Sequence, residues 1–332
     1  MCRHALALAS GGKRATMPRM KWKTALALLL LALVALAVVW MGGRSPRAAV
    51  QQPGDEGVVK LASLHPLLSE MARRVGGEHV QVVNLFPAVA DLHSFTPTGA
   101  DVAAAAGARM LLACGKGVEP YLRDLRDSLP EAVRVLELGE QVPDVLTPDG
   151  RTPDPHWWNT PENMKRASHA LLLALQGEAP AHAADFAARQ RRYAQEMDEL
   201  TRRAKLELAR IPAERRVLVS AHAAMCHFCA AFHFTPIAVQ GVAHESEGDT
   251  AQMAQLLAEL RAHGAPCVFP DAKSAPTFLQ NIADQLHAEL RPLYMDGICP
   301  PDAEGHQMPY EELFMHNVRA IRAGLGDDAT KS

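Results

Sequence analysis

The sequence predicts an α/β protein with two small lobes, each built on a parallel sheet, that are joined by one long rigid spanning helix. Short β-branched runs alternate with amphipathic stretches over residues 58–162 and again over residues 212–328. Such alternation is typical of parallel sheets with helices on both faces. Residues 163–211 contain no strand-like run. We therefore expect an N-terminal α/β lobe, a helical connection and a C-terminal α/β lobe.

In the first lobe, the strand-like runs are rich in valine and leucine, which suit a buried pleated surface. Strands are expected at residues 58–63, 79–86, 110–114 and 134–138, and helices at 65–75, 97–106 and 118–129. Two loops of this lobe contain a histidine: His93 follows the second strand, and His156 lies in the segment D-P-H-W-W after the last strand.

The connection consists of a helix at residues 163–175 and a longer one at residues 180–211. In the longer helix, Phe186, Tyr193, Met197 and Leu200 recur at helical spacing between charged residues, which indicates one apolar face. About 30 residues at about 1.5 Å each would form a rod about 45 Å long. A helix of this length would contact both lobes.

The second lobe repeats the alternation of the first. Strands are expected at residues 216–220, 237–240, 267–270 and 293–296, and helices at 223–232, 250–263, 277–290 and 310–325. His222 directly follows the first of these strands, and Asp296 ends the last of them.

The N-terminal residues have the pattern of an export signal. Lys21 and Lys23 precede an apolar run at residues 25–41, and a basic flank before an apolar core is typical of a secretory signal or an uncleaved anchor. We interpret residues 1–23 as a basic segment, 24–41 as signal anchor or signal peptide core, and 42–57 as linker. The remaining chain is then exported to the periplasm or cell surface, tethered to the inner membrane by this helix unless it is cleaved near Ala48.

Charge and cysteine content limit the classes of function that the protein can have. The formal net charge of −3 is small and no basic stripe is present, which argues against nucleic-acid binding. Export would place most cysteines in an oxidising compartment. We expect Cys226 and Cys229 to be buried free thiols. Cys267 and Cys299 each adjoin a predicted strand, so a disulfide between them is a hypothesis that only their distance can decide.

Three histidines and one aspartate form a candidate metal site: His93, His156, His222 and Asp296. Three imidazoles and a carboxylate are a donor set that zinc prefers. Their wide spacing excludes a local zinc finger. All four lie at or beyond strand ends, where open α/β sheets bind ligands, two before the long helix and two after it. The sequence therefore predicts a single site in the cleft between the lobes.

Eight segments also resemble one protein family in order: A-D-L-H-S-F-T-P-T, A-C-G-K-G-V-E-P-Y-L, D-P-H-W-W, S-A-H-A-A-M-C-H-F, S-E-G-D-T, C-V-F-P-D, L-Y-M-D and Y-E-E-L-F-M-H-N. They resemble the extracytoplasmic solute-binding proteins that supply zinc and manganese to ABC importers. The resemblance covers about residues 58–325. It implies two α/β lobes, a rigid spanning helix and one buried metal site with His93, His156, His222 and Asp296 as ligands.

The sequence departs from the family pattern beside the candidate ligands. Leu92 replaces a proline, Asn159 and Thr160 replace Leu-Asp, and Ala223 replaces an aspartate. These changes alter contacts that orient the imidazoles. A histidine-rich acidic loop, found in many zinc-specific members, is missing from the sequence.

These observations favour a zinc carrier that is monomeric and whose partners are a divalent metal ion and an ABC permease. Manganese or iron is the alternative cargo, because the family also uses these metals, although three nitrogen ligands favour zinc. A zinc hydrolase would need an open coordination position and a base such as Glu245, Glu247 or Asp271. An adhesin of the same fold is a third alternative.

Two further side-chain roles are predicted near the candidate ligands. We expect Trp157 and Trp158 to wall the cleft and exclude water, with one of them facing the core as the alternative. His227 stands at an aromatic position of its segment, and we expect it to pack rather than to bind metal.

Overall fold

The computed structural model describes residues 57–87, 92–239, 250–272, 277–303 and 305–326, with the backbone alone at residues 250–255 and 277. The predictions for residues 1–56, namely the basic segment, the apolar run and most of the linker, lie outside these residues. Within the described ranges, no helix is both long and apolar enough to span a membrane. The chain from Gly57 onward forms one compact unit.

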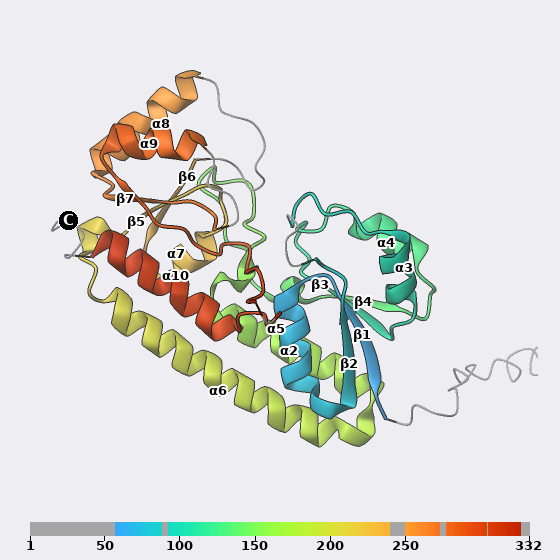
Figure 1. Cartoon of the computed structure of the whole chain (residues 1–332). Coiled ribbons are helices and arrows are strands. Elements are labelled where there is room, and N and C mark those ends of the chain that lie inside the picture. Colours follow the sequence, from blue (N-terminus) through green and yellow to red (C-terminus); the bar gives the residue numbers. More distant parts are fainter. Residues whose placement is uncertain (1–56, 88–91, 240–249, 273–276, 304, 327–332) are drawn as a thin grey trace, which may run out of the picture. The chain divides into compact units, whose positions relative to one another are not determined.

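The N-terminal lobe is a four-stranded parallel sheet in the order β2-β1-β3-β4 (Figure 1). Its strands are β1 (Val59–Ser63), β2 (Val80–Asn84), β3 (Met110–Ala113) and β4 (Arg134–Glu137), and its helices are α2 (Pro66–Gly76), α3 (Gly99–Ala106) and α4 (Leu122–Ser128). Thr98 begins α3 with a capping box, because its side chain accepts from the Asp101 amide while Asp101 accepts from the Thr98 amide.

The C-terminal lobe has the same strand order, β6-β5-β7-β8, and its strands are also parallel. Its strands are β5 (Val217–Ser220), β6 (Thr235–Ala238), β7 (Cys267–Phe269) and β8 (Glu289–Leu290), and its helices are α7 (Cys226–Phe232), α8 (Thr250–His263), α9 (Thr277–Leu286) and α10 (Tyr310–Leu325). The prediction of two parallel-sheet α/β lobes is confirmed.

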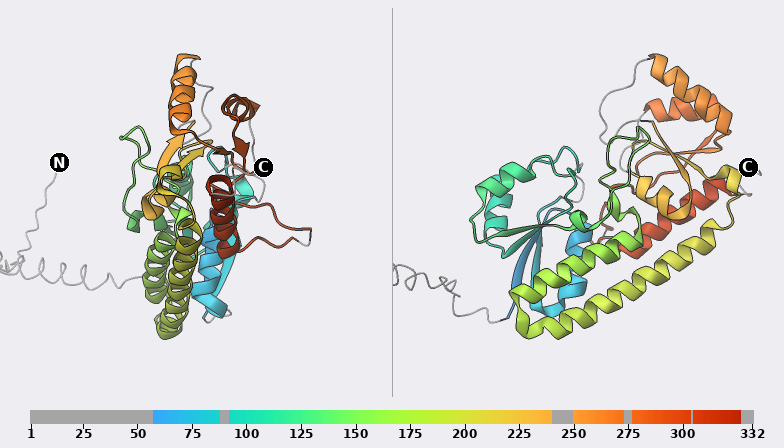
Figure 2. Two further views of the ribbon diagram at one scale, coloured as in Figure 1. Left: turned by 90° about the vertical axis from the view of Figure 1, so that its left-hand side faces the viewer. Right: turned by 180° about the vertical axis from the view of Figure 1, so that it is seen from behind.

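Two helices connect the lobes, α5 (Pro161–Glu178) and α6 (Ala183–Leu208) (Figure 2). The 26 residues of α6 correspond to about 39 Å at about 1.5 Å per residue. Helix α6 packs against α5, against α2 of the first lobe and against α10 of the second. It is shorter than predicted because Pro180–His182 form a separate 3-10 turn before it and because it ends at Leu208, three residues before the predicted end.

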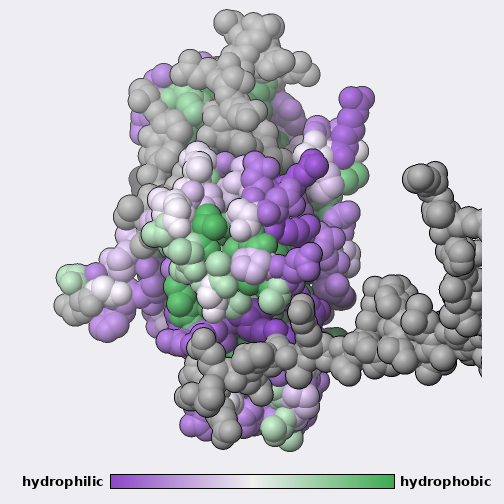
Figure 3. Space-filling model, turned by 90° about the vertical axis from the view of Figure 1, so that its right-hand side faces the viewer, coloured by the Kyte–Doolittle hydropathy of each residue, from purple (hydrophilic) through white to green (hydrophobic). Residues whose placement is uncertain are grey.

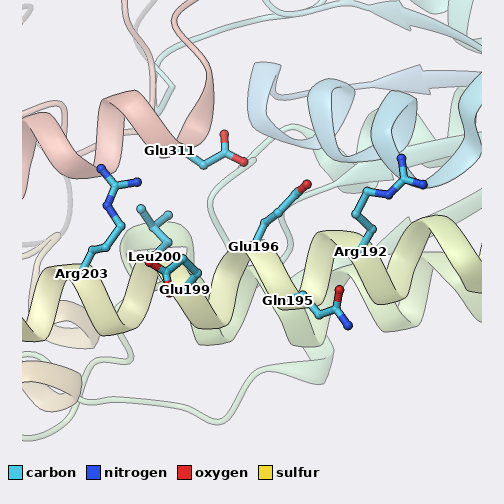
Figure 4. A pocket seen from close by; sticks show the side chains of 7 residues that line it. All are labelled: Arg192, Gln195, Glu196, Glu199, Leu200, Arg203 and Glu311. Atoms are coloured by element: carbon cyan, nitrogen blue, oxygen red, sulfur yellow. The ribbon is translucent and has the colours of Figure 1, made fainter.

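A charged cluster joins α6 to both lobes. Arg74 of α2 pairs with Glu196 of α6 and with Glu311 of α10, and its guanidinium lies 5.0 Å from the Tyr193 ring centre. Figure 4 shows Glu196 and Glu311 directed into the same space between the helices, which is a surface hollow. Because these side chains are partly exposed, each pair contributes modestly, about 0–1 kcal/mol. Together they hold three helices in one arrangement.

Most of the hydrophobic core is continuous through both lobes. A single cluster includes Leu61 of β1, Trp158, Val219 of β5 and Tyr310 of α10. A smaller cluster lies beneath α3 and α4 in the first lobe. On the side of the molecule that carries these two helices, apolar residues also reach the surface (Figure 3). The shared core places the ends of the two sheets next to each other.

The last predicted strand of the second lobe is wrong in its position. The helix predicted to residue 290 ends at Leu286, and Glu289–Leu290 form β8 instead. Residues 293–296 are not a strand, apart from a single bridge between Leu293 and Asp271. His287 adopts a left-handed backbone (φ 53°) that stops the helix early, and Pro292 lacks the amide that a longer strand needs.

Several helix ends and β6 also differ from the prediction by a few residues. Helix α5 begins earlier, at Pro161, because Thr160 caps it by accepting from the Asn163 amide. Helices α4 and α7 begin later, at Leu122 and Cys226, and strand β6 begins two residues earlier, at Thr235.

The cysteines of the described residues are all free and buried. This confirms the expectation for Cys226 and Cys229. It contradicts a disulfide between Cys267 and Cys299, because the two thiols have different neighbours. Cys267 lies against α10 at Gly324, whereas the Cys299 thiol donates to the Pro300 carbonyl at 3.3 Å.

Candidate metal centre

The structure brings the four candidate ligands together where the two lobes meet. One donor atom from each of His93, His156, His222 and Asp296 lies within 4.8 Å of every other. The Nε2 atoms of His93 and His156 are 3.1 Å apart. Asp296 Oδ1 lies 3.4 Å from His222 Nε2 and 3.8 Å from His156 Nε2. Two of these side chains precede α6 in the sequence and two follow it.

Three of the separations between these atoms are close to those around a tetrahedral metal ion. Zinc binds nitrogen and oxygen ligands at about 2.0–2.1 Å, and a tetrahedron with such bonds separates its ligand atoms by about 3.3 Å. The separations of 3.1, 3.4 and 3.8 Å lie on either side of this value, and all four donor atoms lie within 4.8 Å of one another. The three imidazole rings also cross at steep angles of 68–84°. The three rings are therefore not stacked on one another, and one nitrogen of each lies in the same small region.

His156 is fixed by the aspartate two residues before it. Its Nδ1 lies 2.7 Å from Asp154 Oδ1, and its backbone amide donates to the same oxygen at 2.9 Å. An Nδ1–H that donates to Asp154 leaves Nε2 as the lone-pair nitrogen that faces the site. The second carboxylate oxygen accepts from the Cys226 amide at 2.8 Å, at the start of α7. Asp154 thus joins His156 to the second lobe.

The buried charge of Asp154 is stabilised by these contacts. Burial alone would raise the pKa of this carboxyl group, but the hydrogen bonds that it accepts from His156 outweigh burial, and the net pKa is lowered. Asp154 is therefore an ionised carboxylate at neutral pH.

His222 lies two residues beyond the end of strand β5 and is fully buried. Burial alone would lower the pKa of its imidazole, but the carboxylates of Asp296, Asp271 and Asp154 outweigh burial and raise the pKa above its ordinary value of 6.5. The same negative charge that stabilises a proton here would stabilise a cation. The carboxylates around His222 therefore favour a positive charge at this position.

Asp296 lies in a tight turn, in which Gly297 donates its amide to the Tyr294 carbonyl at 3.3 Å. Gly297 has φ +67°, and a Cβ there would lie 2.5 Å from Leu67 Cδ1. The left-handed backbone favours glycine here, and a Cβ would also displace the Leu67 side chain of α2. The Met295 amide donates to Asp271 Oδ2 at 3.3 Å. Asp271 therefore supports the turn that carries Asp296.

His93 is the most accessible of the four candidate ligands. Its side chain is half-buried, whereas His156, His222 and Asp296 are at most 1 % exposed. It lies in the loop between β2 and α3, where the adjacent Leu92 is fully buried and Phe95 packs edge-on against Phe86 at 5.1 Å. These apolar contacts anchor the loop on the first lobe.

Sequence reasoning missed the role of His65. Its Nδ1 accepts from the Leu67 amide at 3.1 Å and so caps α2, which leaves Nε2–H to donate to the Asp296 carbonyl at 2.9 Å. His65 thereby ties the first lobe to the turn that carries Asp296. Its position just after β1 matches the pattern that identified the other histidines, and this was the available signal.

Trp157, Trp158 and His227 are all buried beside the candidate ligands. The Trp158 ring packs edge-on against His156 at 5.4 Å, whereas the Trp157 indole donates to the Cys114 carbonyl at 3.1 Å in the core of the first lobe. His227 does more than pack: its Nε2 lies 3.0 Å from the Asp154 carbonyl, and its Nδ1 lies 3.2 Å from Asn163 Nδ2. Burial lowers the pKa of His227, which favours the neutral ring.

Comparisons with known proteins agree with this fold and geometry. The manganese-binding lipoprotein MntA of Bacillus subtilis is 24 % identical over 265 residues, which cover 78 % of this chain and 87 % of that protein. The zinc-binding protein TroA of Treponema pallidum is 25 % identical over 265 residues, which cover 78 % of this chain and 86 % of TroA. The solved structure of TroA has the same fold, with a TM-score of 0.73 and 24 % identity over 81 % of this chain and 100 % of that structure.

The family model described as zinc-uptake complex component A, periplasmic, matches residues 61–324. This match covers most of the chain and both lobes. The family and the fold of this chain are those of solute-binding proteins of metal importers. The chain belongs to the family of the periplasmic zinc-uptake component A.

Proposed function

We propose that this protein captures a divalent metal ion outside the cytoplasm and delivers it to an ABC-type permease. The observation that carries the proposal is the convergence of four donor atoms, three imidazole nitrogens and one carboxylate oxygen, within 4.8 Å. His93, His156, His222 and Asp296 are the proposed ligands. Neutral imidazoles and an ionised carboxylate bind the ion, and contact with the permease releases it.

Zinc is the proposed cargo. Three nitrogen donors and one oxygen donor at tetrahedral spacing suit zinc, whereas manganese prefers more oxygen ligands and a higher coordination number. Manganese and iron are the alternatives, because curated relatives are named for binding manganese, zinc and iron. Elemental analysis of the protein as isolated, followed by competition among zinc, manganese and iron, distinguishes these cargoes.

We propose binding without catalysis. A hydrolytic zinc site keeps an open position for water and places a general base beside it. Asp296 is positioned to take the fourth coordination position, and Asp271 already accepts from the Met295 amide. The other bases considered, Glu245 and Glu247, lie outside the described residues. An adhesive role of the same fold would not require donor atoms arranged around one cation.

The protein is proposed to act outside the cytoplasm as a monomer. The N-terminal apolar run at residues 25–41 supports export and a tether in the inner membrane, and the matching family is described as periplasmic. The permease recognises the loaded protein in this proposal.

Zinc binding by the purified protein and by single alanine variants tests the proposal. The parent should bind one zinc ion and gain about 2.7 kcal/mol of stability when free zinc is a hundredfold above the dissociation constant. His93→Ala and His156→Ala should weaken binding. His306→Ala is the matched control, because His306 is an exposed histidine outside the candidate ligand set that pairs with Asp302 at 3.3 Å. A parent protein with no zinc-dependent thermal shift, indistinguishable from His93→Ala, would refute the proposal.

A further inference from the structure

One buried carboxamide links the chain segments that carry three of the candidate ligands. Asn159 is 3 % exposed and ends the short 3-10 turn that follows His156. Its Nδ2 donates to two backbone carbonyls, those of Ala224 and Met295, each at 2.8 Å. A carboxamide has two N–H donors, so both are used.

The two carbonyls belong to the segments that contain the other ligands. Ala224 lies two residues after His222, and Met295 directly precedes Asp296. Asn159 itself lies three residues after His156. The positions of three candidate ligands are thus related through the two hydrogen bonds of one side chain.

Neighbouring contacts make this link rigid. The Met295 carbonyl also accepts from the Trp158 indole at 3.0 Å, so both of its lone pairs have a donor. The Asn159 amide donates to the His156 carbonyl at 3.3 Å, which keeps the turn closed. Buried hydrogen bonds that share an acceptor in this way restrict the arrangement of the surrounding chain.

We propose that Asn159 is a positioning residue that sets the separation of His156, His222 and Asp296, and with it the affinity and geometry of the metal site. This inference rests on the proposed metal-binding function. Asn159 is also one of the positions at which this sequence departs from its family pattern, where a leucine would offer no donor to either carbonyl. The pair of hydrogen bonds that Asn159 donates is therefore a feature of this chain and not of the family pattern.

The isosteric change Asn159→Asp tests the inference. It keeps the shape of the side chain but replaces the two N–H donors with an acceptor, so that a carboxylate oxygen faces two carbonyl oxygens. The segments of His222 and Asp296 should move apart. Loss of contacts that orient metal ligands weakens binding on the order of 10–100-fold. We expect a loss of zinc affinity of that size and a changed visible d–d absorption spectrum when cobalt(II) is bound.

Gln190→Glu is the matched control. Gln190 is a buried amide, 8 % exposed, whose Nε2 donates to Ser168 Oγ at 3.2 Å between α5 and α6, remote from the candidate ligands. The same change from amide to carboxylate should lower the unfolding temperature of the protein without altering its zinc affinity or its cobalt spectrum. A purely structural role for Asn159 would give the same result as this control.

The outcomes separate the inference from the proposed function. If the parent binds zinc and Asn159→Asp matches the control in affinity and cobalt spectrum, the inference is overturned. If Asn159→Asp does not fold, Asn159→Ser decides, because a hydroxyl group can donate to only one carbonyl and should give an intermediate loss of affinity. Parent-like affinity in Asn159→Ser overturns the inference as well. A parent that binds no zinc overturns the proposed function first.

Discussion

Replacing Asp154 with asparagine should weaken both the fold and the metal site. Three N–H groups converge on this carboxylate: the His156 amide at 2.9 Å, His156 Nδ1 at 2.7 Å and the Cys226 amide at 2.8 Å. Asp154 is fully buried, so no solvent replaces these contacts. Asparagine preserves the shape of the side chain but removes its charge and one of its two acceptor oxygens.

Either orientation of the new amide leaves a buried donor facing another donor. If the NH2 group faces Cys226, the first amide of α7 loses its acceptor. If it faces His156, that ring must change tautomer, and its Nε2–H then points at the metal position. An unsatisfied buried donor costs about 1–3 kcal/mol, and a hydrogen bond to a charged group contributes about 1.5–3 kcal/mol. We expect a loss of about 2–4 kcal/mol in the free energy of unfolding.

Urea unfolding of the metal-free protein and zinc competition measure the two effects separately. Zinc affinity should fall on the order of 10–100-fold, as for other groups that orient a metal-bound imidazole. Asp302→Asn is the matched control, because Asp302 pairs with His306 at 3.3 Å on the surface. It should change stability by less than about 0.5 kcal/mol. An Asp154→Asn variant as stable as this control, with the zinc affinity of the parent, would refute the reasoning.

Two predictions concern pH. Zinc affinity should fall as pH decreases through the pKa of His222, which lies above 6.5, because a proton and the metal compete for the same nitrogen. An affinity that is constant between about pH 8 and about pH 5, where histidine titrates, would contradict this. Burial raises the pKa of Glu119 from 4.5 to about 7, although its bonds from the Cys114 and Gly115 amides oppose the shift. The folded state therefore holds this proton more tightly than the unfolded chain, and the free energy of unfolding should decrease by about 3 kcal/mol as pH rises from about 4.5 to about 7. Glu119→Gln should lack this decrease, and parallel pH curves for the two proteins would show that Glu119 does not cause it.

The architecture could be predicted from sequence because its signals are local. Valine-rich runs such as that of β1 and the periodic apolar face of α6 identify element types within short windows. The position of β8 could not be predicted in this way. Residues 293–296 are apolar enough for a strand, but the left-handed backbone at His287 and the proline at position 292 move the pairing residues to Glu289–Leu290. Asp296 therefore lies in a turn beyond the strand.

The candidate ligands could be predicted as a group because their positions beyond strand ends converge in a repeated topology. What holds them could not, since the contacts join residues far apart in the sequence. His65 bonds to the Asp296 carbonyl and Asn159 to the Met295 carbonyl, across 231 and 136 residues respectively. In each case the acceptor is a backbone carbonyl, which leaves no trace in residue identity. From the sequence, Asp154 could be recognised only as a member of the segment D-P-H-W-W, and its contacts could not be predicted.

The four candidate ligands differ in how they are held, and under the proposed function this difference would affect how a metal ion enters and leaves. His156, His222 and Asp296 are buried, and their segments are tied together by hydrogen bonds that cross between the lobes. His93 is half-buried in a loop that packs on the first lobe through apolar contacts. Withdrawal of His93 would therefore leave these hydrogen bonds between the lobes intact. His93→Ala should leave three ligands in place and retain weakened zinc binding, whereas His156→Ala also leaves the Asp154 carboxylate without its imidazole partner and should cost stability as well as affinity.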